Sequence, residues 1–437
     1  MISLIGLIAA LALLVILTIR GMNLMIAAPF CAIMVAITGN LPIIPDVNDT
    51  QSFITVYMDG FAGFLAAWFF MFLLGSLFGK FMEESGAADT IALTIVSHLG
   101  MKNAVAAIII ACAILTYGGV SLFVVAFSVY PMAVSLFKKA DLPRRFIPAA
   151  MAFGSVTFTM TSAGSPEIQN WIPIKHLGTT PYAAWEVSLF VAICMASVGF
   201  WWLSRMVKKA TANGETFQAR ENDPVLKQQD KLPPFWASVI PIVTVLVITF
   251  VFHKEYAQYS LVMSLASGCL AAWFVTHRSM EGLDRVVAQG TTGAVIAIAN
   301  TSAVVGFGAV AKVSPAFDLA VGAITSIPGN ELIGAAVAVT VIAAMTGSAS
   351  GGQSIALPVL APHYIDAGVD PEALHRVVAI SSGALDSLPH NGYVVTTIRA
   401  ICNETHKAAY GPMAALTVVI PVLGTILALI CFVVFGW

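Results

Sequence analysis

Two segments interrupt apolar stretches of this chain at matching positions. Residues 161–170 and 386–393 each lie inside an otherwise apolar segment, yet both concentrate glycine, proline, hydroxyl, amide and ionisable side chains. In hydrocarbon, unwound backbone is tolerated only where protein buries it or where it lines a water-filled cavity. Interrupted segments at corresponding positions of two halves point to the midplane binding site of a transporter. The sequence therefore predicts a protein that moves a small solute across a membrane.

The apolar composition excludes an ordinary soluble domain. Hydrophobic residues make up 58% of the chain and charged residues only 10%, which is typical of a membrane protein. Several continuous apolar runs approach or exceed the ~20 residues that span a bilayer core of ~30 Å. These runs lie at 2–18, 61–78, 187–203, 235–252 and 412–435. Because the runs are continuous rather than alternating, they argue against a β-barrel, and the expected class is an all-α polytopic membrane protein.

The cysteines and the charge balance argue against several other classes of protein. The six cysteines are scattered and contain no Cys-x-x-Cys pair, which argues against a disulfide framework or a zinc site. No basic tail or cluster with interleaved aromatics is present, so no nucleic-acid partner is expected. We expect no cofactor, and the first apolar run is interpreted as the first span rather than a signal peptide because no basic flank precedes it.

Basic residues next to the spans predict which side of the membrane each loop faces. Lys and Arg beside a span mark the cytoplasmic side. The acidic loop 41–59 should therefore face outward, whereas Arg20 and Lys80 should face inward. This topology places both termini outside a cell (inner) membrane, and it also places Lys175 and Arg376 outside.

Two segments are predicted to enter and leave the membrane on the same side. Segment 103–138 has basic residues at both ends, and each limb has roughly 14–16 residues, which reach only ~21–24 Å at 1.5 Å per residue. A limb that short does not cross a ~30 Å core. We therefore predict a re-entrant helical hairpin that turns at Gly118 and Gly119. Segment 331–366 has the same form around residues 347–354, but it is flanked by acids and is expected to enter from the outside.

The two halves of the chain are predicted to be inverted repeats. Tyr182 and Tyr410 lie 228 positions apart in similar contexts, Pro-Tyr-Ala-Ala and Ala-Ala-Tyr-Gly. Each repeat holds about five spans, one of them broken at the midplane, plus one hairpin. An odd number of crossings requires the second repeat to be inverted. The predicted bounds are 1–210 for the first repeat (broken helix 145–175), 211–234 for a cytoplasmic linker, and 235–437 for the second repeat (broken helix 373–402).

Small and polar residues at the hairpin tips and breaks are the candidate substrate-binding residues. Free N–H groups at the start of a half-helix suit a carboxylate, and free carbonyls at a half-helix end suit a cation. No arginine lies in the tips or breaks, and none is expected to be needed. The alternative is that the small residues only allow close helix packing. The candidates are Gly118, Gly119, Ser121, Ser162, Gly164, Ser165, Ser348, Ser350, Gly351, Gly352, Gln353, Ser387, His390 and Asn391.

Three ionisable residues in the breaks are the candidates for proton coupling. Asp386 and Glu167 are carboxyls at membrane depth, where ionisation costs free energy, so each is a candidate proton carrier. His390 titrates nearer neutral pH and could share that role. The alternatives are an N-cap role for Asp386 on the helix after Pro389, a position at the mouth of the break for Glu167, and a structural role for His390.

Three motifs resemble the gluconate permease family of proton symporters. Residues 78–89 (Phe-Gly-Lys-Phe-Met-Glu-Glu-Ser-Gly-Ala-Ala-Asp) resemble the motif that follows an early span in that family. Residues 164–170 look like the first-half break of its wider relatives, and residues 382–392, followed by Thr405-His-Lys, are similar to its hydroxybutyrate permease branch. The resemblance covers nearly the whole chain. It implies a small hydroxy-carboxylate substrate, proton coupling, the inverted repeats of the ion transporter superfamily, and a homodimer.

The leading hypothesis is a proton-coupled symporter of a short hydroxy-monocarboxylate, such as 3-hydroxybutyrate or gluconate. One alternative is a sodium-coupled di- or tricarboxylate transporter of the same fold. Sodium-coupled relatives carry Ser-Asn-Thr at the hairpin tips, and both tips here lack Asn. Another alternative is an anion channel. An enzyme is not expected, because the chain lacks His-Glu-x-x-His and Ala349 occupies the central place of the one segment near Gly-x-Ser-x-Gly.

Overall fold

A computed structural model of the chain is helical throughout the part that it describes, which comprises residues 2–20, 22–45, 51–100, 103–221, 223–224, 232–256, 259–280, 282–317, 319, 322 and 330–437. No strand occurs among these residues. Within them, seven helical segments are long and apolar enough to cross a membrane. The expected class, an all-α polytopic membrane protein, is confirmed. A chain of this kind must be helical because lipid offers its backbone no hydrogen-bond partners.

In its described part, the first half builds four helices, a helical hairpin, a broken helix and a further long helix. The helices before the hairpin are α1 (Ile2–Ile19), α2 (Leu24–Thr38), α3 (Phe53–Glu84) and α4 (Ala87–Leu99). The hairpin consists of α5 (Ala104–Tyr117) and α6 (Leu122–Lys139). After it come α7 (Ile147–Ala152), α8 (Ile172–Leu177) and α9 (Trp185–Ala212). Helix α4 was not predicted from the sequence. The predicted loop 41–59 is shorter than expected because α3 begins at Phe53, and residues 46–50 of that loop lie outside the described part.

The second half contains the same kinds of element in a similar order. Three long helices come first: α10 (Phe235–Tyr256), α11 (Tyr259–Thr276) and α12 (Leu283–Lys312). The hairpin is α14 (Glu331–Thr346) and α15 (Ala349–Asp366). The remaining helices are α16 (Pro371–Ser382), α17 (Gly392–Val395), α18 (His406–Ala414) and α19 (Ile420–Val433). The inversion of the two repeats stays a prediction from the charge pattern.

The longest helices, α3 and α12, pack closely along each other. Their contact is lined by glycine, because a Cβ added at Gly60 would lie 2.5 Å from the Ala309 Cβ. Two hydrogen bonds cross the same contact: the Tyr57 hydroxyl donates to the Ala303 carbonyl at 3.0 Å, and the Ser76 hydroxyl donates to the Gly290 carbonyl at 2.8 Å. Small residues and interhelical hydrogen bonds are what hold helices together in lipid. The α3–α12 pair, with α10 and α11 beside it, therefore forms a scaffold for the rest of the chain.

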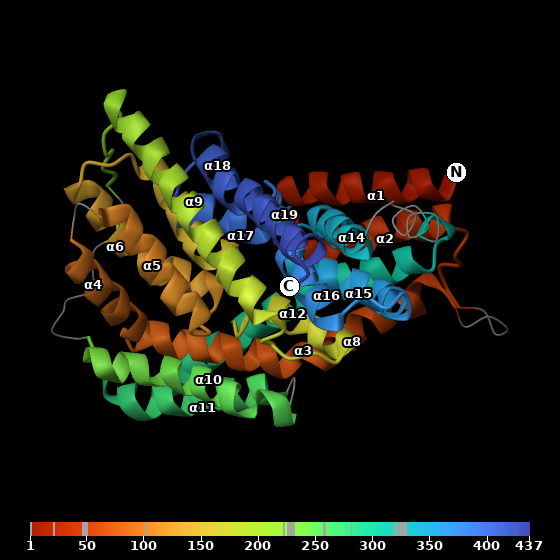
Figure 1. Cartoon of the computed structure of the whole chain (residues 1–437), viewed down its shortest axis with the longest axis horizontal. Coiled ribbons are helices and arrows are strands. Elements are labelled where there is room, and N and C mark those ends of the chain that lie inside the picture. Colours follow the sequence, from red (N-terminus) through yellow and green to blue (C-terminus); the bar gives the residue numbers. More distant parts are fainter. Residues whose placement is uncertain are drawn as a thin grey trace.

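The scaffold and the two hairpins lie in different parts of the molecule. Figure 1 shows α3, α10 and α11 together along the lower edge, with α9, α18 and α19 above them. The α5–α6 and α14–α15 hairpins lie towards opposite ends of the long axis in the same view (Figure 1). The α5–α6 hairpin contacts α7 of the first broken helix, and the α14–α15 hairpin contacts α8 of the first and α16 of the second.

Buried apolar side chains form two separate clusters. The larger cluster extends from the middle of α3 through both hairpins and both broken helices to α19. The smaller cluster joins α1 and α2 to the first turns of α3, at Phe53 and Tyr57, and to the last turns of α12, at Phe307 and Val310. Helix α3 is therefore shared by both clusters.

The linker after α9 is bound to the start of the first broken helix. Arg145 forms a two-bond ion pair with Glu215, at 2.7 and 2.8 Å. Arg144 donates to the Gln218 carbonyl at 3.0 Å and pairs with Asp223 at 2.9 Å. Arg144 also pairs with Glu404, at 3.1 Å, so the linker, the first broken helix and the loop after the second one meet at this point.

Candidate functional site

The first break is a long unwound segment that is closed by the loop after it. A π-helical turn at Phe153–Thr157 precedes the break, and regular helix resumes at Ile172. π-Helical turns occur frequently at functional sites. The N–H of Gly164 donates to the Pro181 carbonyl at 2.8 Å, and the Asn170 side chain donates to the same carbonyl at 2.9 Å. We call residues 179–184 the covering loop, because its inner face closes over this break.

The second break is shorter and is organised by an asparagine. It lies between α16, which ends at Ser382, and α17, which begins at Gly392. The Asn391 side chain accepts from the Val394 N–H at 3.0 Å and so caps α17. Its amide also donates to the Asp386 carbonyl at 3.1 Å, which closes the break upon itself. The N-cap role considered for Asp386 is therefore wrong, because Asn391 fills it.

Each hairpin tip contacts the break of its own half. At the first tip, the Tyr117 hydroxyl donates to the Ala163 carbonyl at 2.6 Å. At the second tip, Asn391 donates to the Gly347 carbonyl at 2.9 Å. His390 lies against the same glycine, since a Cβ added at Gly347 would be 2.7 Å from the His390 Cδ2. The turn at the second tip contains fewer residues than expected. It is formed by Gly347 and Ser348, and residues 350–353 already lie at the start of α15.

Three contacts join the two halves at the breaks. The Gln353 side chain of the second hairpin donates to the Gln169 carbonyl of the first break at 3.0 Å. The rings of Phe123 and Tyr393 meet edge to face with centroids 5.6 Å apart. A Cβ added at Gly383 would lie 3.5 Å from the Thr161 methyl group. Both tips and both breaks therefore form one connected region.

Several predicted site residues lie in helix contacts rather than at the breaks. A Cβ at Gly118 would lie 2.6 Å from the Ile242 Cγ2 of α10, and Ser121 contacts Gly79 of α3. A Cβ at Gly352 would lie 2.7 Å from the Ala343 Cα, so this glycine lets the two limbs of its own hairpin approach. Gly351 contacts Val304 of α12 in the same manner. These positions have the close-packing geometry that was the alternative reading of the tips.

The carboxyls and hydroxyls of the breaks differ in their surroundings. Asp386 is buried, at 7% exposure, and its Oδ1 accepts from the Ser387 hydroxyl at 2.9 Å. Glu167 is half-buried, and within the described part of the chain its carboxylate has no hydrogen-bond partner. Ser165 accepts from the Trp171 indole through its carbonyl, at 2.9 Å, while the Ser162 hydroxyl donates to the Phe158 carbonyl. His390 is buried, and its Nε2 has no hydrogen-bond partner among the residues that the structure describes.

The most deeply buried ionisable group of the region was not predicted. Arg376 was placed outside the membrane by its charge, yet its side chain is fully buried in α16. Its guanidinium donates to the Thr161 carbonyl at 2.6 Å and to the Asn170 side-chain oxygen at 3.1 Å. No arginine was expected to be needed at the breaks, yet Arg376 bonds to the first break from α16, outside the tips and breaks themselves. A basic residue about two turns before a break in an apolar segment was the signal that could have identified it.

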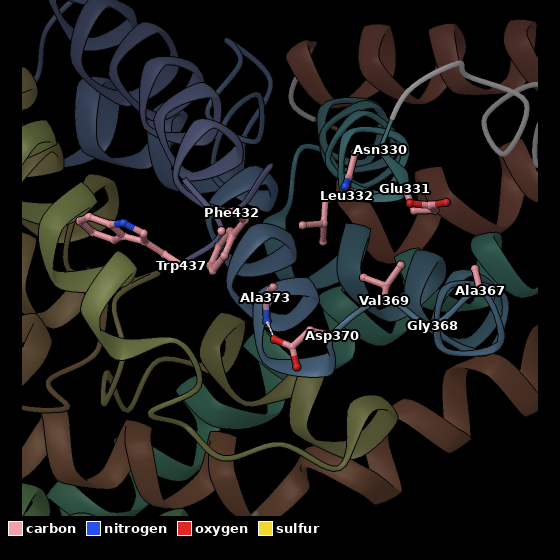
Figure 2. A pocket seen from close by; sticks show the side chains of 11 residues that line it. Asn330, Glu331, Leu332, Ala367, Gly368, Val369, Asp370, Ala373, Phe432 and Trp437 are labelled. Carbon is pink, nitrogen blue, oxygen red and sulfur yellow. Dashed lines mark hydrogen bonds between the residues drawn. The ribbon is translucent and has the colours of Figure 1, made fainter. Parts of the chain in front are cut away.

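A surface pocket of about 330 Å³ lies away from the breaks. It is bounded by the start of α14, the turn between α15 and α16, and the end of α19 (Figure 2). Asp370, which accepts from the Ala373 N–H at 2.9 Å, is part of its lining. The pocket includes no residue of a tip or a break, so we do not assign the transport site to it.

Comparisons with known proteins agree with this architecture. The family model described as GntP family permease matches residues 2–434. The chain is 34% identical to the uncharacterized transporter YxjC of Bacillus subtilis over 95% of this chain and 96% of that protein. It is 22% identical to an uncharacterized transporter of Haemophilus influenzae over 80% and 81% of the two chains.

A solved structure has the same fold. The structure of the YdaH transporter of Alcanivorax borkumensis, described as having an unusual topology, superimposes with a TM-score of 0.59 at 15% identity. The superposition covers 100% of this chain and 99% of that one. At this identity the likeness concerns the fold alone. The match of the family model over nearly the whole length shows that this chain belongs to the GntP permease family of transporters.

Proposed function

We propose that this protein is a proton-coupled symporter that carries a small hydroxy-monocarboxylate, of the 3-hydroxybutyrate or gluconate type, across the inner membrane. The observation that carries the proposal is the single region formed by two hairpin tips and two breaks. Within it lie Asp386, a buried carboxyl, and the unwound backbone of both breaks, which is tolerated at membrane depth only where protein buries it or where it lines a cavity. The motif around the second break, residues 382–392, supports the hydroxybutyrate type of substrate.

Electrostatics favour one proton per monoanion. At 100 mV, negative inside, the movement of one charge is worth ~2.3 kcal/mol, which opposes the entry of an anion alone. One accompanying proton removes this opposition and leaves the pH gradient as the driving force. A citrate-like substrate would need several cations, and in the described part of the chain Arg376 is the one arginine or lysine that bonds to a break.

The contacts at the tips also favour a transporter over a channel. Each break is packed against its own hairpin, as in the bond from Tyr117 to Ala163, and the two halves are joined through Gln353. Such a packed centre suits alternating access around a closed site more than an open pore. We propose the carrier as a homodimer with both termini outside, as the charge pattern and the family resemblance predict.

The test is uptake of labelled D-3-hydroxybutyrate into proteoliposomes under a pH gradient and, separately, under a sodium gradient. Asp386→Asn is compared with Asp366→Asn, a matched change of an exposed carboxylate at the end of α15. We expect uptake to follow the pH gradient, to be lost in Asp386→Asn and to persist in Asp366→Asn.

The other outcomes separate the rival functions. Uptake that follows sodium in both variants would replace the proton with sodium as the coupling ion. Uptake that depends on neither gradient and is accompanied by an electrical current would favour the anion channel. If D-3-hydroxybutyrate is not taken up but gluconate is, the proposed substrate changes and the proposed mechanism of coupling stands.

A further inference from the structure

Helix α16 of the second half holds the covering loop of the first half at three points. The Glu372 carboxylate accepts from the Ala184 N–H at 3.2 Å. Further along α16, the His375 Nδ1 and the Thr179 hydroxyl are 2.7 Å apart. Arg376 then donates to the Ala183 carbonyl from two nitrogens, at 2.9 and 3.1 Å. We call Glu372, His375 and Arg376 the α16 clamp.

The guanidinium of Arg376 has no donor left for a substrate. Arginine has five N–H groups. Two bonds go to Ala183, one goes to Thr161, one goes to the Asn170 side chain, and a longer one of 3.5 Å goes to Pro181. Within the described part of the chain no ion pair joins it to a carboxylate. Arg376 therefore acts on the break through the backbone that it holds, as a positioning residue.

The covering loop is the layer between the first break and the surface. Its inner residues Thr179 and Ala183 are buried, at 8% and 1% exposure, whereas Gly178 and Trp185 on either side are exposed. The Tyr182 ring lies over the break, since a Cβ added at Gly164 would be 2.6 Å from its Cε1. Removal of this loop from the break would uncover Gly164 and its neighbours.

The covering loop contains a backbone conformation that is unfavourable without support from its surroundings. Ala184 has φ of +42°, a left-handed backbone that costs a residue with a side chain free energy. Such a conformation persists only where the surroundings enforce it, and the clamp bonds to Ala184 and to the residue before it. Release of the clamp would therefore let the loop relax away from the break.

We propose that the covering loop is a gate over the first break and that the α16 clamp is its latch. In this arrangement a movement of the second half opens the site of the first half. Two of the three points of the latch are bonds to the loop backbone and the third is the contact between His375 and Thr179, so the latch acts whichever carboxylate or coupling ion the protein carries.

The gate is tested by the reactivity of a thiol placed under the loop. Ser162→Cys, half-buried in the first break, is introduced in a background with Cys194→Ser, because Cys194 is the half-buried native thiol among otherwise buried cysteines. A membrane-impermeant maleimide is applied to one side of proteoliposomes at a time. Two exposed positions serve as references for the side of labelling. Lys175→Cys lies at the end of the first broken helix, and Asn213→Cys lies at the end of α9.

Arg376→Gln should raise the labelling rate of Cys at 162 by about tenfold or more, because each lost hydrogen bond to a charged group is worth ~1.5–3 kcal/mol. The increase should occur from the side that also labels the thiol at 175. Thr179→Val, which removes one hydroxyl at the clamp, should give a smaller increase from the same side. Buried Cys112 serves as the control for folding and should stay unlabelled.

Unchanged labelling in both variants, with Cys112 still protected, would overturn the gate. If Arg376→Gln also exposes Cys112, that variant is unfolded and Thr179→Val decides the question alone. An increase from the side of residue 213 would equally contradict the proposal, because it would place the opening at the other end.

Discussion

The side chain of Gln353 and the main chain of Gln169 meet at 3.0 Å across the boundary between the two halves. The same amide nitrogen lies 2.9 Å from the Ser382 hydroxyl at the end of α16. Gln353 is fully buried, so both bonds are shielded from water and lipid. One glutamine thus joins the second hairpin, the first break and the start of the second break.

Replacement of this glutamine should therefore destabilise the protein measurably. Gln353→Leu keeps the volume but leaves the Gln169 carbonyl unsatisfied, which costs ~1–3 kcal/mol. Ser354→Ala is the matched control, because that hydroxyl bonds only within its own helix, to the Ser350 carbonyl. Thermal unfolding in detergent should show a clear decrease for the first variant and a small one for the second. Equal melting temperatures would mean that the Gln353 bonds do not contribute to stability.

Gly347 should be intolerant of any side chain. Its φ of +59° is left-handed, which costs a residue with a Cβ ~1–2 kcal/mol, and the added atom would overlap the His390 ring. Gly347→Ala should therefore displace His390 and abolish uptake. Gly392→Ala is the matched control, since a Cβ there meets nothing within 4 Å. Uptake that survives the change at 347 would exclude His390 from the transport path.

Two neighbouring arginines should differ strongly in their contribution to stability. The pair of Arg144 and Glu404 is buried, at 6% and 7% side-chain exposure, whereas that of Arg145 and Glu215 is exposed at 32% and 40%. Removal of one partner from a buried pair costs ~3–5 kcal/mol, but from an exposed pair ~1 kcal/mol or less. Glu404→Gln should consequently lower the unfolding temperature far more than Glu215→Gln. The reverse order would show that the linker, rather than the loop after the second break, carries the stability.

Acid should loosen the linker at Glu215. The hydrogen bond from Arg145 lowers the pKa of this carboxyl below its usual value of about 4.5. A lowered pKa contributes stability that is present above the usual value and is lost as the pH falls through the lowered one. Limited proteolysis of the linker should therefore accelerate below about pH 4 in the wild type. The linker of Glu215→Gln should be cleaved at the same rate across that pH range. If its cleavage also accelerates in acid, another group causes the effect.

The breaks and hairpins could be predicted because their signals are local. Glycine, proline and polar side chains inside an apolar run mark an unwound backbone wherever the run packs, and observed breaks lie within a few residues of 161–170 and 386–393. The limb lengths of the hairpins follow from the spacing of charged residues. The family followed from the motif at 382–392, and the family model confirms it.

The partners of the site residues could not be predicted, because they come from distant parts of the chain. Arg376 binds oxygens roughly 200 positions away, and the charge rule for loops placed it outside. The cap of α17 is Asn391 rather than Asp386 because the helix begins at Gly392, so Asn391 is the residue directly before it. Gly118 and Gly352 were predicted as substrate-binding residues because they lie at or next to the hairpin tips. Their packed neighbours, which the sequence does not reveal, show that they allow close helix contacts.

The separation of the buried apolar side chains into two clusters has a consequence for how the protein unfolds. Among the described residues, the buried apolar side chains of α1 and α2 cluster with those of the first turns of α3, the last turns of α12 and Ala316, so these two helices constitute a cooperative unit of their own. Heating can open this unit while the breaks, tips and clamp remain assembled in the other. A substitution that weakens α1 or α2 should therefore first produce an early, separate melting transition, while α3 and α12, which contribute side chains to both clusters, keep the two units joined.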